Sequence, residues 1–125
     1  MFLGIQKDTR ILDIQKEFNT FYPYLKLEFF KNHAPQKKLA PKAEKINPVE
    51  AVNNITPFYE PGSISIDKKR TVAQLVQDFQ ESFGLSVLVF RKSGNLWIET
   101  SLTDSWTLGK QNIIGESFST KTENL

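Results

Sequence analysis

A pattern of apolar residues near the amino terminus recurs in the second half of the chain. A constant shift of 61 positions brings residues 3–18 into register with residues 64–79. A shift of 60 continues the match between residues 25–31 and 85–91. The matched apolar pairs are Leu3 and Ile64, Ile5 and Ile66, Ile11 and Val72, Ile14 and Leu75, Phe18 and Phe79, Leu25 and Leu85, and Leu27 and Val87. One unit therefore occurs twice, either by true duplication or because similar elements share a periodicity.

Each copy of the unit changes from strand to helix and back to strand. The first segment alternates apolar and polar residues, as a short strand with one buried face does. The next places its apolar residues in one helical stripe. The third alternates again and is rich in β-branched and aromatic residues. The predicted elements are strand 2–6, helix 10–21 and strand 24–31 in the first copy, and strand 63–67, helix 71–83 and strand 85–91 in the second.

The boundaries of the second copy have local signals. Thr71 and Gln74 form a capping box, whose two side chains satisfy free amide groups at a helix start. Gly84 suits the left-handed conformation that ends a helix. Ser93 and Gly94 predict a tight turn, so the chain should return as an antiparallel strand near 95–101.

The remaining segments are less regular. Five of the six prolines lie within residues 32–61, together with several lysines, which predicts a long inserted loop. Residues 106–114 predict a short helix. The polar residues 115–125 are expected to form a flexible tail.

This order of elements predicts one α+β domain over residues 1–125, a length typical of single domains. Two successive β-α-β units resemble the ferredoxin-like sandwich, in which both helices pack on one face of an antiparallel sheet. An extra C-terminal strand and a short helix would complete it. The main alternative is a duplicated unit of strand, helix and two strands, which the turn at Ser93 and Gly94 suits equally.

Two segments also resemble a family of small uncharacterised bacterial proteins. They are FYPYLKLEFF at residues 21–30 and FGLSVLVFRKSGNLWIETSLTDSWTL at residues 83–108. The resemblance implies no activity, because these segments contain no catalytic motif.

Composition excludes several classes of function. The chain has no cysteine, which excludes disulfides, thiol nucleophiles and thiolate metal sites. Its single histidine is insufficient for most zinc sites. No cofactor or metal is expected. The amino terminus lacks the features of a secretory signal, and no apolar run approaches membrane-spanning length, so we expect a cytoplasmic protein without a membrane partner.

Enzymatic activity is an alternative that depends on few residues. Glu28 and Glu99 could meet across neighbouring strands as a carboxylate pair, the arrangement used for acid and base catalysis. His33 lies near Glu28 in the sequence, within the predicted loop. Exposed carboxylates that keep a sheet soluble, and a solvated histidine, explain the same residues without catalysis. We therefore predict no catalytic residue.

Nucleic-acid binding is a second alternative. The predicted loop contains a basic cluster that could contact phosphates, although the whole chain has a net charge of only +2. Aromatic residues on the sheet could stack on bases. The aromatic signature of RNA-recognition sheets is missing, however. The candidate residues are Lys37, Lys38, Lys42 and Lys45.

The outer face of the predicted sheet favours a protein-interaction module. Alternation places one set of strand residues toward the helices and leaves a second, half-apolar set facing away. Exposed apolar patches of this kind need a cover. The cover is either the chain's own loop and terminal helix or another chain, with a homodimer as the first expectation. The candidate residues are Tyr24, Phe30, Leu88, Phe90 and Trp97.

Overall fold

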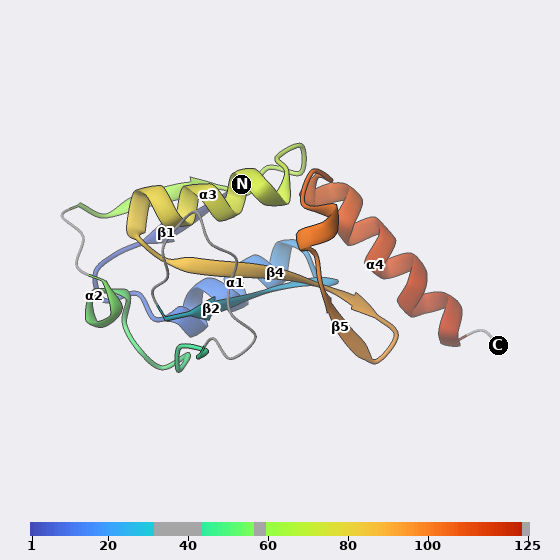
Figure 1. Ribbon diagram of the computed structural model, residues 1–125, viewed down its shortest axis with the longest axis horizontal. Helices are drawn as coiled ribbons and strands as arrows, with labels where there is room; N and C mark the ends of the chain where they lie inside the picture. The colour runs from blue at the N-terminus through green and yellow to red at the C-terminus, as the bar shows by residue number, and fades with distance from the viewer. Residues whose placement is uncertain (32–43, 57–59, 124–125) are drawn as a thin grey trace.

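A computed structural model of the chain describes residues 1–31, 44–56 and 60–123 (Figure 1). The described part is a mixture of helices and antiparallel strands, which confirms the α+β class. In chain order the elements are β1 (Phe2–Ile5), α1 (Ile11–Phe21), β2 (Leu25–Phe30), α2 (Val52–Ile55), β3 (Gly62–Ser65), α3 (Val72–Phe83), β4 (Ser86–Ser93), β5 (Leu96–Glu99), the 3-10 helix η1 (Ser101–Thr103) and α4 (Leu108–Glu123).

The strands form two sheets, so the prediction of one continuous sheet is wrong. Among the described residues, β1 pairs only with β3, and β2, β4 and β5 form a separate three-stranded sheet in the order β2-β4-β5. All pairings are antiparallel. The ferredoxin-like arrangement requires the first and third strands to lie inside the same sheet as the others, which the described residues do not show. Sequence alternation identifies strands and their buried faces, but it does not say which strands pair.

Each sheet is built around a pair of equivalent residues from the two copies. The β1–β3 register is centred on Leu3 opposite Ile64, which the shift of 61 also matches. The β2–β4 register is centred on Glu28 opposite Leu88, which the shift of 60 matches. Pairing of equivalent strands about equivalent centres is the geometry of a two-fold axis. The two copies are therefore related by an approximate internal two-fold.

The repeat extends further than the sequence match. Two isolated bridges occupy equivalent places, Arg10 with Ala51 and Thr71 with Thr107. A backbone hydrogen bond lies beside each bridge. Its donor is the amide of the first residue of α2 or α4, and its acceptor is the carbonyl of the residue two positions before α1 or α3. These bonds run from Val52 to Thr9 and from Leu108 to Arg70, both at 2.8 Å. The short helix α2 and the first turn of α4 are therefore equivalent elements.

The third strand of the unit has a counterpart in both copies, although in the first copy it is only an isolated bridge. Lys45 forms an isolated bridge with Phe30, and Glu99 pairs with Phe90 in the equivalent position of β5. Residues 44–46 thus lie along β2 as β5 lies along β4. The structure agrees with the alternative unit of strand, helix and two strands.

The helix ends confirm the local sequence signals of the second copy. The Gln74 amide donates to the Thr71 hydroxyl at 3.1 Å, and the Thr71 amide donates to the Gln74 side chain at 3.0 Å. Gly84 ends α3 in the left-handed conformation, with φ of 64°. At the equivalent place in the first copy, the Arg10 amide donates to the Asp13 carboxylate at 3.0 Å.

One core lies between the two sheets and the helices α1 and α3. α1 packs against β1 and β2, and α3 packs against β3 and β4. Phe79 of α3 meets Phe29 of β2 edge to face, with ring centroids 5.3 Å apart. The strand residues predicted to face the helices are all buried, namely Leu25, Leu27, Phe29, Leu85, Val87 and Val89.

The C-terminal helix is longer than predicted. α4 runs from Leu108 to Glu123, whereas a short helix followed by a flexible tail from 115 was expected (Figure 1). Small residues allow this polar segment to pack. Gly115 lies against Tyr24 and Arg91, and the Ser119 hydroxyl accepts a hydrogen bond from the Gly94 amide at 3.3 Å. Its contact stripe contains few large apolar residues, so hydrophobic periodicity did not reveal it.

The predicted insertion is partly structured. Residues 32–43 and 57–59 lie outside the described residues. Between them, residues 44–46 align with β2, and α2 forms one helical turn at Val52–Ile55.

Candidate protein-interaction surface

The five residues predicted for the outer sheet face are not equally accessible. Phe30 is buried, with 7% of its surface exposed. Tyr24, Leu88, Phe90 and Trp97 are half-buried. The structure therefore places them outside the main core, yet leaves only part of each ring or chain in contact with solvent.

Two members of this set are engaged with other elements of the chain. The Tyr24 amide donates to the Asn112 side chain of α4 at 2.9 Å, and Gly115 packs on the Tyr24 β-carbon. Phe30 lies in the bridge to Lys45. α4 thus contacts Tyr24 at the start of β2, but it packs on the Arg91 side of the sheet, opposite the face that carries Phe90 and Trp97.

The rings of Phe90 and Trp97 both contact the ammonium group of Lys26. The Lys26 ammonium lies 4.9 Å from the centroid of the Trp97 ring and 5.7 Å from that of Phe90. The Glu28 carboxylate forms ion pairs with this ammonium and with that of Lys45, at 3.6 Å in each case. Cation–π contact and ion pairing hold both rings in defined positions on the sheet.

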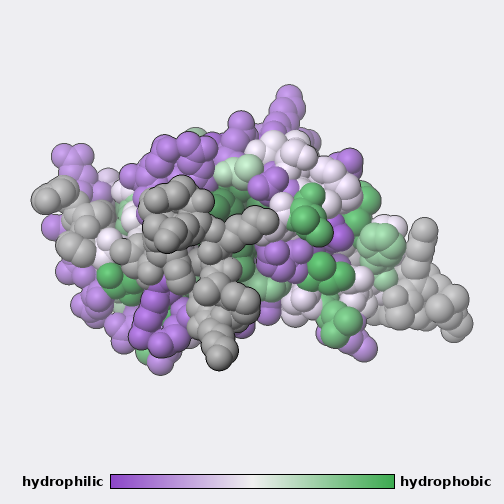
Figure 2. All heavy atoms as spheres, in the orientation of Figure 1, coloured by the Kyte–Doolittle hydropathy of each residue, from purple (hydrophilic) through white to green (hydrophobic). Residues whose placement is uncertain are grey.

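Sequence reasoning missed three exposed apolar residues of this region. On β5, 69% of Leu96 and 42% of Ile98 are exposed, and Phe118 of α4 is 52% exposed. Figure 2 shows apolar side chains at the end of the molecule where β5 and α4 lie. The missing signal is topological. An edge strand beyond the core exposes both faces, so alternation alone cannot distinguish its inner residues.

The outer edge of β5 is open in the described part of the chain. β4 pairs with one side of β5, through registers such as Arg91 opposite Ile98. The Thr100 amide donates to the Val89 carbonyl at 3.1 Å, which fixes the backbone groups that point toward β4. By alternation, the amides and carbonyls of Trp97 and Glu99 point away from β4.

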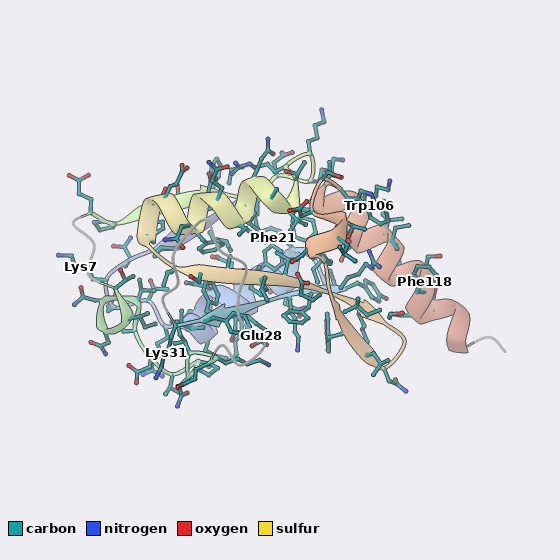
Figure 3. All side chains as sticks on the ribbon, in the orientation of Figure 1. Lys7, Phe21, Glu28, Lys31, Trp106 and Phe118 are labelled. Carbon is teal, nitrogen blue, oxygen red and sulfur yellow. The ribbon has the colours of Figure 1, made fainter. Side chains whose placement is uncertain are left out.

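The base of α4 is fixed by a second aromatic cluster. The Lys110 ammonium lies 4.2 Å from the centroid of the Trp106 ring, and the Arg91 guanidinium lies 5.6 Å from it. Trp106 lies at the start of α4 (Figure 3). Arg91 also donates to the Gln111 side chain at 2.8 Å. These contacts join α4 to β4, so the hairpin and the helix form one end of the molecule.

The candidates for catalysis are not brought together. Glu28 is paired with lysines, and the Glu99 carboxylate accepts the Ser101 amide at 2.7 Å. His33 lies outside the described residues. An open hollow of about 540 Å³ is lined by residues 44–47 together with Lys31 and Glu50 among others, and in it Lys31 and Glu44 pair at 3.0 Å. The described residues contain no group of three or more potential metal ligands.

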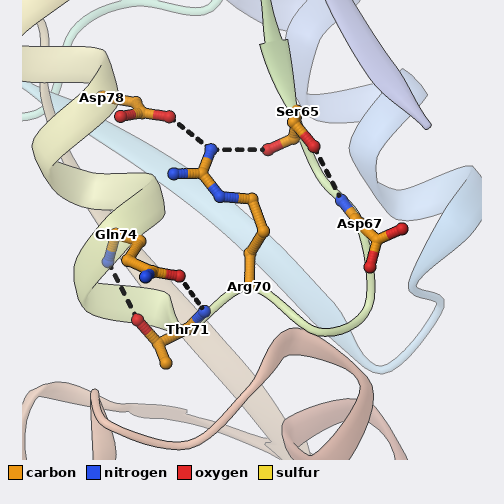
Figure 4. A network of polar contacts seen from close by, with 6 residues as sticks. All are labelled: Ser65, Asp67, Arg70, Thr71, Gln74 and Asp78. Atoms are coloured by element: carbon orange, nitrogen blue, oxygen red, sulfur yellow. Dashed lines mark hydrogen bonds and ion pairs between the residues drawn. The ribbon is translucent and has the colours of Figure 1, made fainter.

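The basic residues predicted for nucleic-acid binding gain no support from the structure. Lys37, Lys38 and Lys42 lie outside the described residues. Lys45, the fourth candidate, pairs with Glu28. In the basic run formed by residues 68–70, Arg70 forms an ion pair with Asp78 and donates to the Ser65 carbonyl (Figure 4). No observation on the described lysines and arginines favours this function.

No described helix has the length and apolar character needed to cross a membrane. Comparisons with protein-family models, with curated proteins and with solved structures found no match. The resemblance to small uncharacterised bacterial proteins therefore stays a prediction.

Proposed function

We propose that this protein is a non-enzymatic protein-interaction module that self-associates through its three-stranded sheet. The observation that carries the proposal is the group of apolar residues outside the core on the β4–β5 hairpin. Leu88, Phe90 and Trp97 lie half-buried on one face of the sheet, and Leu96 and Ile98 lie exposed on the opposite face, the side of Arg91. We call these five residues, which lie on both faces of the hairpin, the hairpin surface.

The size of this surface supports association. Burying one large apolar side chain completely contributes about 1.5–3 kcal/mol. Leu96 and Ile98 still have much of that surface in water. In a two-fold contact, each of these residues is buried in both copies, so the free energy from its burial counts twice. This offsets the several kcal/mol that association costs in lost translational and rotational freedom.

The proposal includes a cytoplasmic location and no cofactor. A chain without cysteine needs no oxidising compartment. The described carboxylates of Glu28 and Glu99 are paired with lysines or a backbone amide instead of converging on a pocket, which supports binding over catalysis.

Sedimentation velocity across a concentration series tests self-association. We expect the apparent mass to rise with concentration from that of the 14.4 kDa monomer toward twice that value. Ile98→Glu should keep the protein monomeric, because it places a charge in the buried contact. Gln6→Glu adds the same charge at an exposed loop position and should behave as the unchanged chain. A monomer at every concentration would refute the proposal.

A further inference from the structure

The open edge of β5 offers a defined set of hydrogen-bonding groups. Trp97 and Glu99 each direct one amide and one carbonyl away from β4, and none of these four groups has a partner among the described residues. Ile98 lies between them, and its own backbone groups point toward β4. The edge of β5 therefore has unpaired backbone groups at Trp97 and Glu99, on either side of the apolar residue Ile98.

We propose that a second copy of the chain pairs with this edge, so that β5 meets β5 of the second copy in antiparallel orientation. This inference rests on the proposed function and names the contact that performs it. In the proposed register, Trp97 of each copy lies opposite Glu99 of the other, and Ile98 lies opposite Ile98. The sheet then continues across the two-fold axis from one copy to the other.

The structure selects this register over its neighbours. Centring on Ile98 lets Trp97 and Glu99 exchange both bonds with their opposite residues, so all free groups of the strand are used. Centring on Trp97 would require Asn95, which lies in the turn, to extend the ladder. Centring on Glu99 would place two carboxylates directly opposite each other, which is unfavourable.

The same register covers exposed apolar surface. Residues opposite each other in a non-hydrogen-bonded antiparallel pair have Cα atoms about 4.5 Å apart, so the two Ile98 side chains pack closely. α4 packs on the Arg91 side of the sheet, which is also the side of Ile98. Leu96 lies on that side and is brought toward Thr100 of the second copy.

A second copy is the occupant that the geometry favours. The edge is self-complementary, because it carries equal numbers of free donors and acceptors placed symmetrically about Ile98. The chain already joins equivalent strands in this way. Both internal pairings, β1 with β3 and β2 with β4, are antiparallel and centred on equivalent residues.

Single-cysteine variants test the register directly, because the chain has no cysteine of its own. Ile98→Cys should form a disulfide-linked dimer under mild oxidation, since the two thiols face each other across the axis at a separation that suits a disulfide. Leu96→Cys is the matched control. It is more exposed and on the same face, yet its two copies lie about four residues apart along the pair, so it should not cross-link.

Proline substitution tests the hydrogen bonds. Glu99→Pro removes an amide that points away from β4, so the β4–β5 pairing is kept while each copy loses one bond to the other. Relative to Glu99→Ala, we expect dimerisation to weaken about 30-fold, for two lost hydrogen bonds of ordinary strength. Circular dichroism of both variants checks that the monomer stays folded.

The outcomes separate the two proposals. A dimer in sedimentation that cross-links through Ile98→Cys and not through Leu96→Cys supports the β5 pairing. A dimer that cross-links equally through both, or only through Leu96→Cys, overturns the pairing and leaves self-association standing. A chain that stays monomeric in sedimentation overturns both.

Discussion

Tyr22 links the two sheets and provides a test of the fold at high pH. It follows α1, is buried at 4% exposure, and its hydroxyl donates to the carbonyl of Ile66 just after β3. Its ring packs on Phe18, with centroids 5.3 Å apart. Burial, with a smaller contribution from the negative charge of Asp67, raises the pKa of Tyr22 from 10.0 to about 12.

The sign of the effect follows from proton binding. Between pH 10 and 12 the folded protein keeps the phenol proton, whereas the unfolded chain loses it. The stabilisation that protonated Tyr22 contributes is therefore fully present below pH 10 and is lost as the pH rises toward the pKa of the folded protein. At about 1.4 kcal/mol per pH unit, two units amount to a loss of about 3 kcal/mol from this group by pH 12.

Tyr22→Phe isolates this contribution. The variant keeps the ring and loses only the hydroxyl, so at pH 7 it should be less stable by about 1–2 kcal/mol because the Ile66 carbonyl loses its donor. The difference should shrink above pH 10 and change sign near about pH 11. Urea unfolding of both proteins from pH 7 to 11.5 measures this, and phenolate absorbance follows the titration itself. Parallel stability curves for the two proteins, or a Tyr22 that titrates near 10, would refute the reasoning.

Three further substitutions test packing and capping by urea unfolding. Phe79→Ala should destabilise by about 3–5 kcal/mol, because the cavity also removes the contact with Phe29; a loss below about 1 kcal/mol would contradict full burial. Thr71→Ala should cost about 1 kcal/mol through the lost cap, and Thr71→Ser should restore most of it. Gly115→Ala should destabilise although alanine favours helices, since its methyl would lie 2.9 Å from the Tyr24 β-carbon; amide exchange should locate the loosening in α4.

Local sequence signals predicted the individual elements well. The two long helices have strong apolar stripes and the second has a capping box, and both are properties of residues close together in the sequence. The buried strand faces were equally readable, since alternation puts each inward residue on one side. The turn at Gly94 also follows from a local need, because its φ is 63°.

The division into two sheets was not readable from the same signals. Whether β2 and β4 form their own sheet or share one with β1 and β3 depends on contacts between residues that are distant in the sequence. The length of α4 was underestimated for a related reason. Gly115 and Ser119 stabilise its packing by allowing close approach, and small polar residues give no hydrophobic period.

The candidate site was predicted in part. Phe90 and Trp97 do lie together outside the core, as alternation indicated. Phe30 is buried instead, because residues 44–46 close that edge of β2. The exposure of Ile98 could not be anticipated, since it depends on β5 lying at the edge of the sheet in the described part of the chain.

The internal two-fold also indicates which parts of the molecule are free to serve a function. Elements common to both copies form the core and cannot vary independently without losing it. The copies differ most after the third strand, where the first copy has the four-residue helix α2 and the second has α4 over Leu108–Glu123. They also differ in the third strand itself, which is an isolated bridge at Lys45 but a full hairpin strand at Leu96–Glu99. The second copy thus extends the sheet and supports the extension with α4, and neither addition is needed to complete the shared core. Among the described residues, the second copy therefore carries the open strand edge and the exposed Leu96 and Ile98 on which the proposed self-association depends.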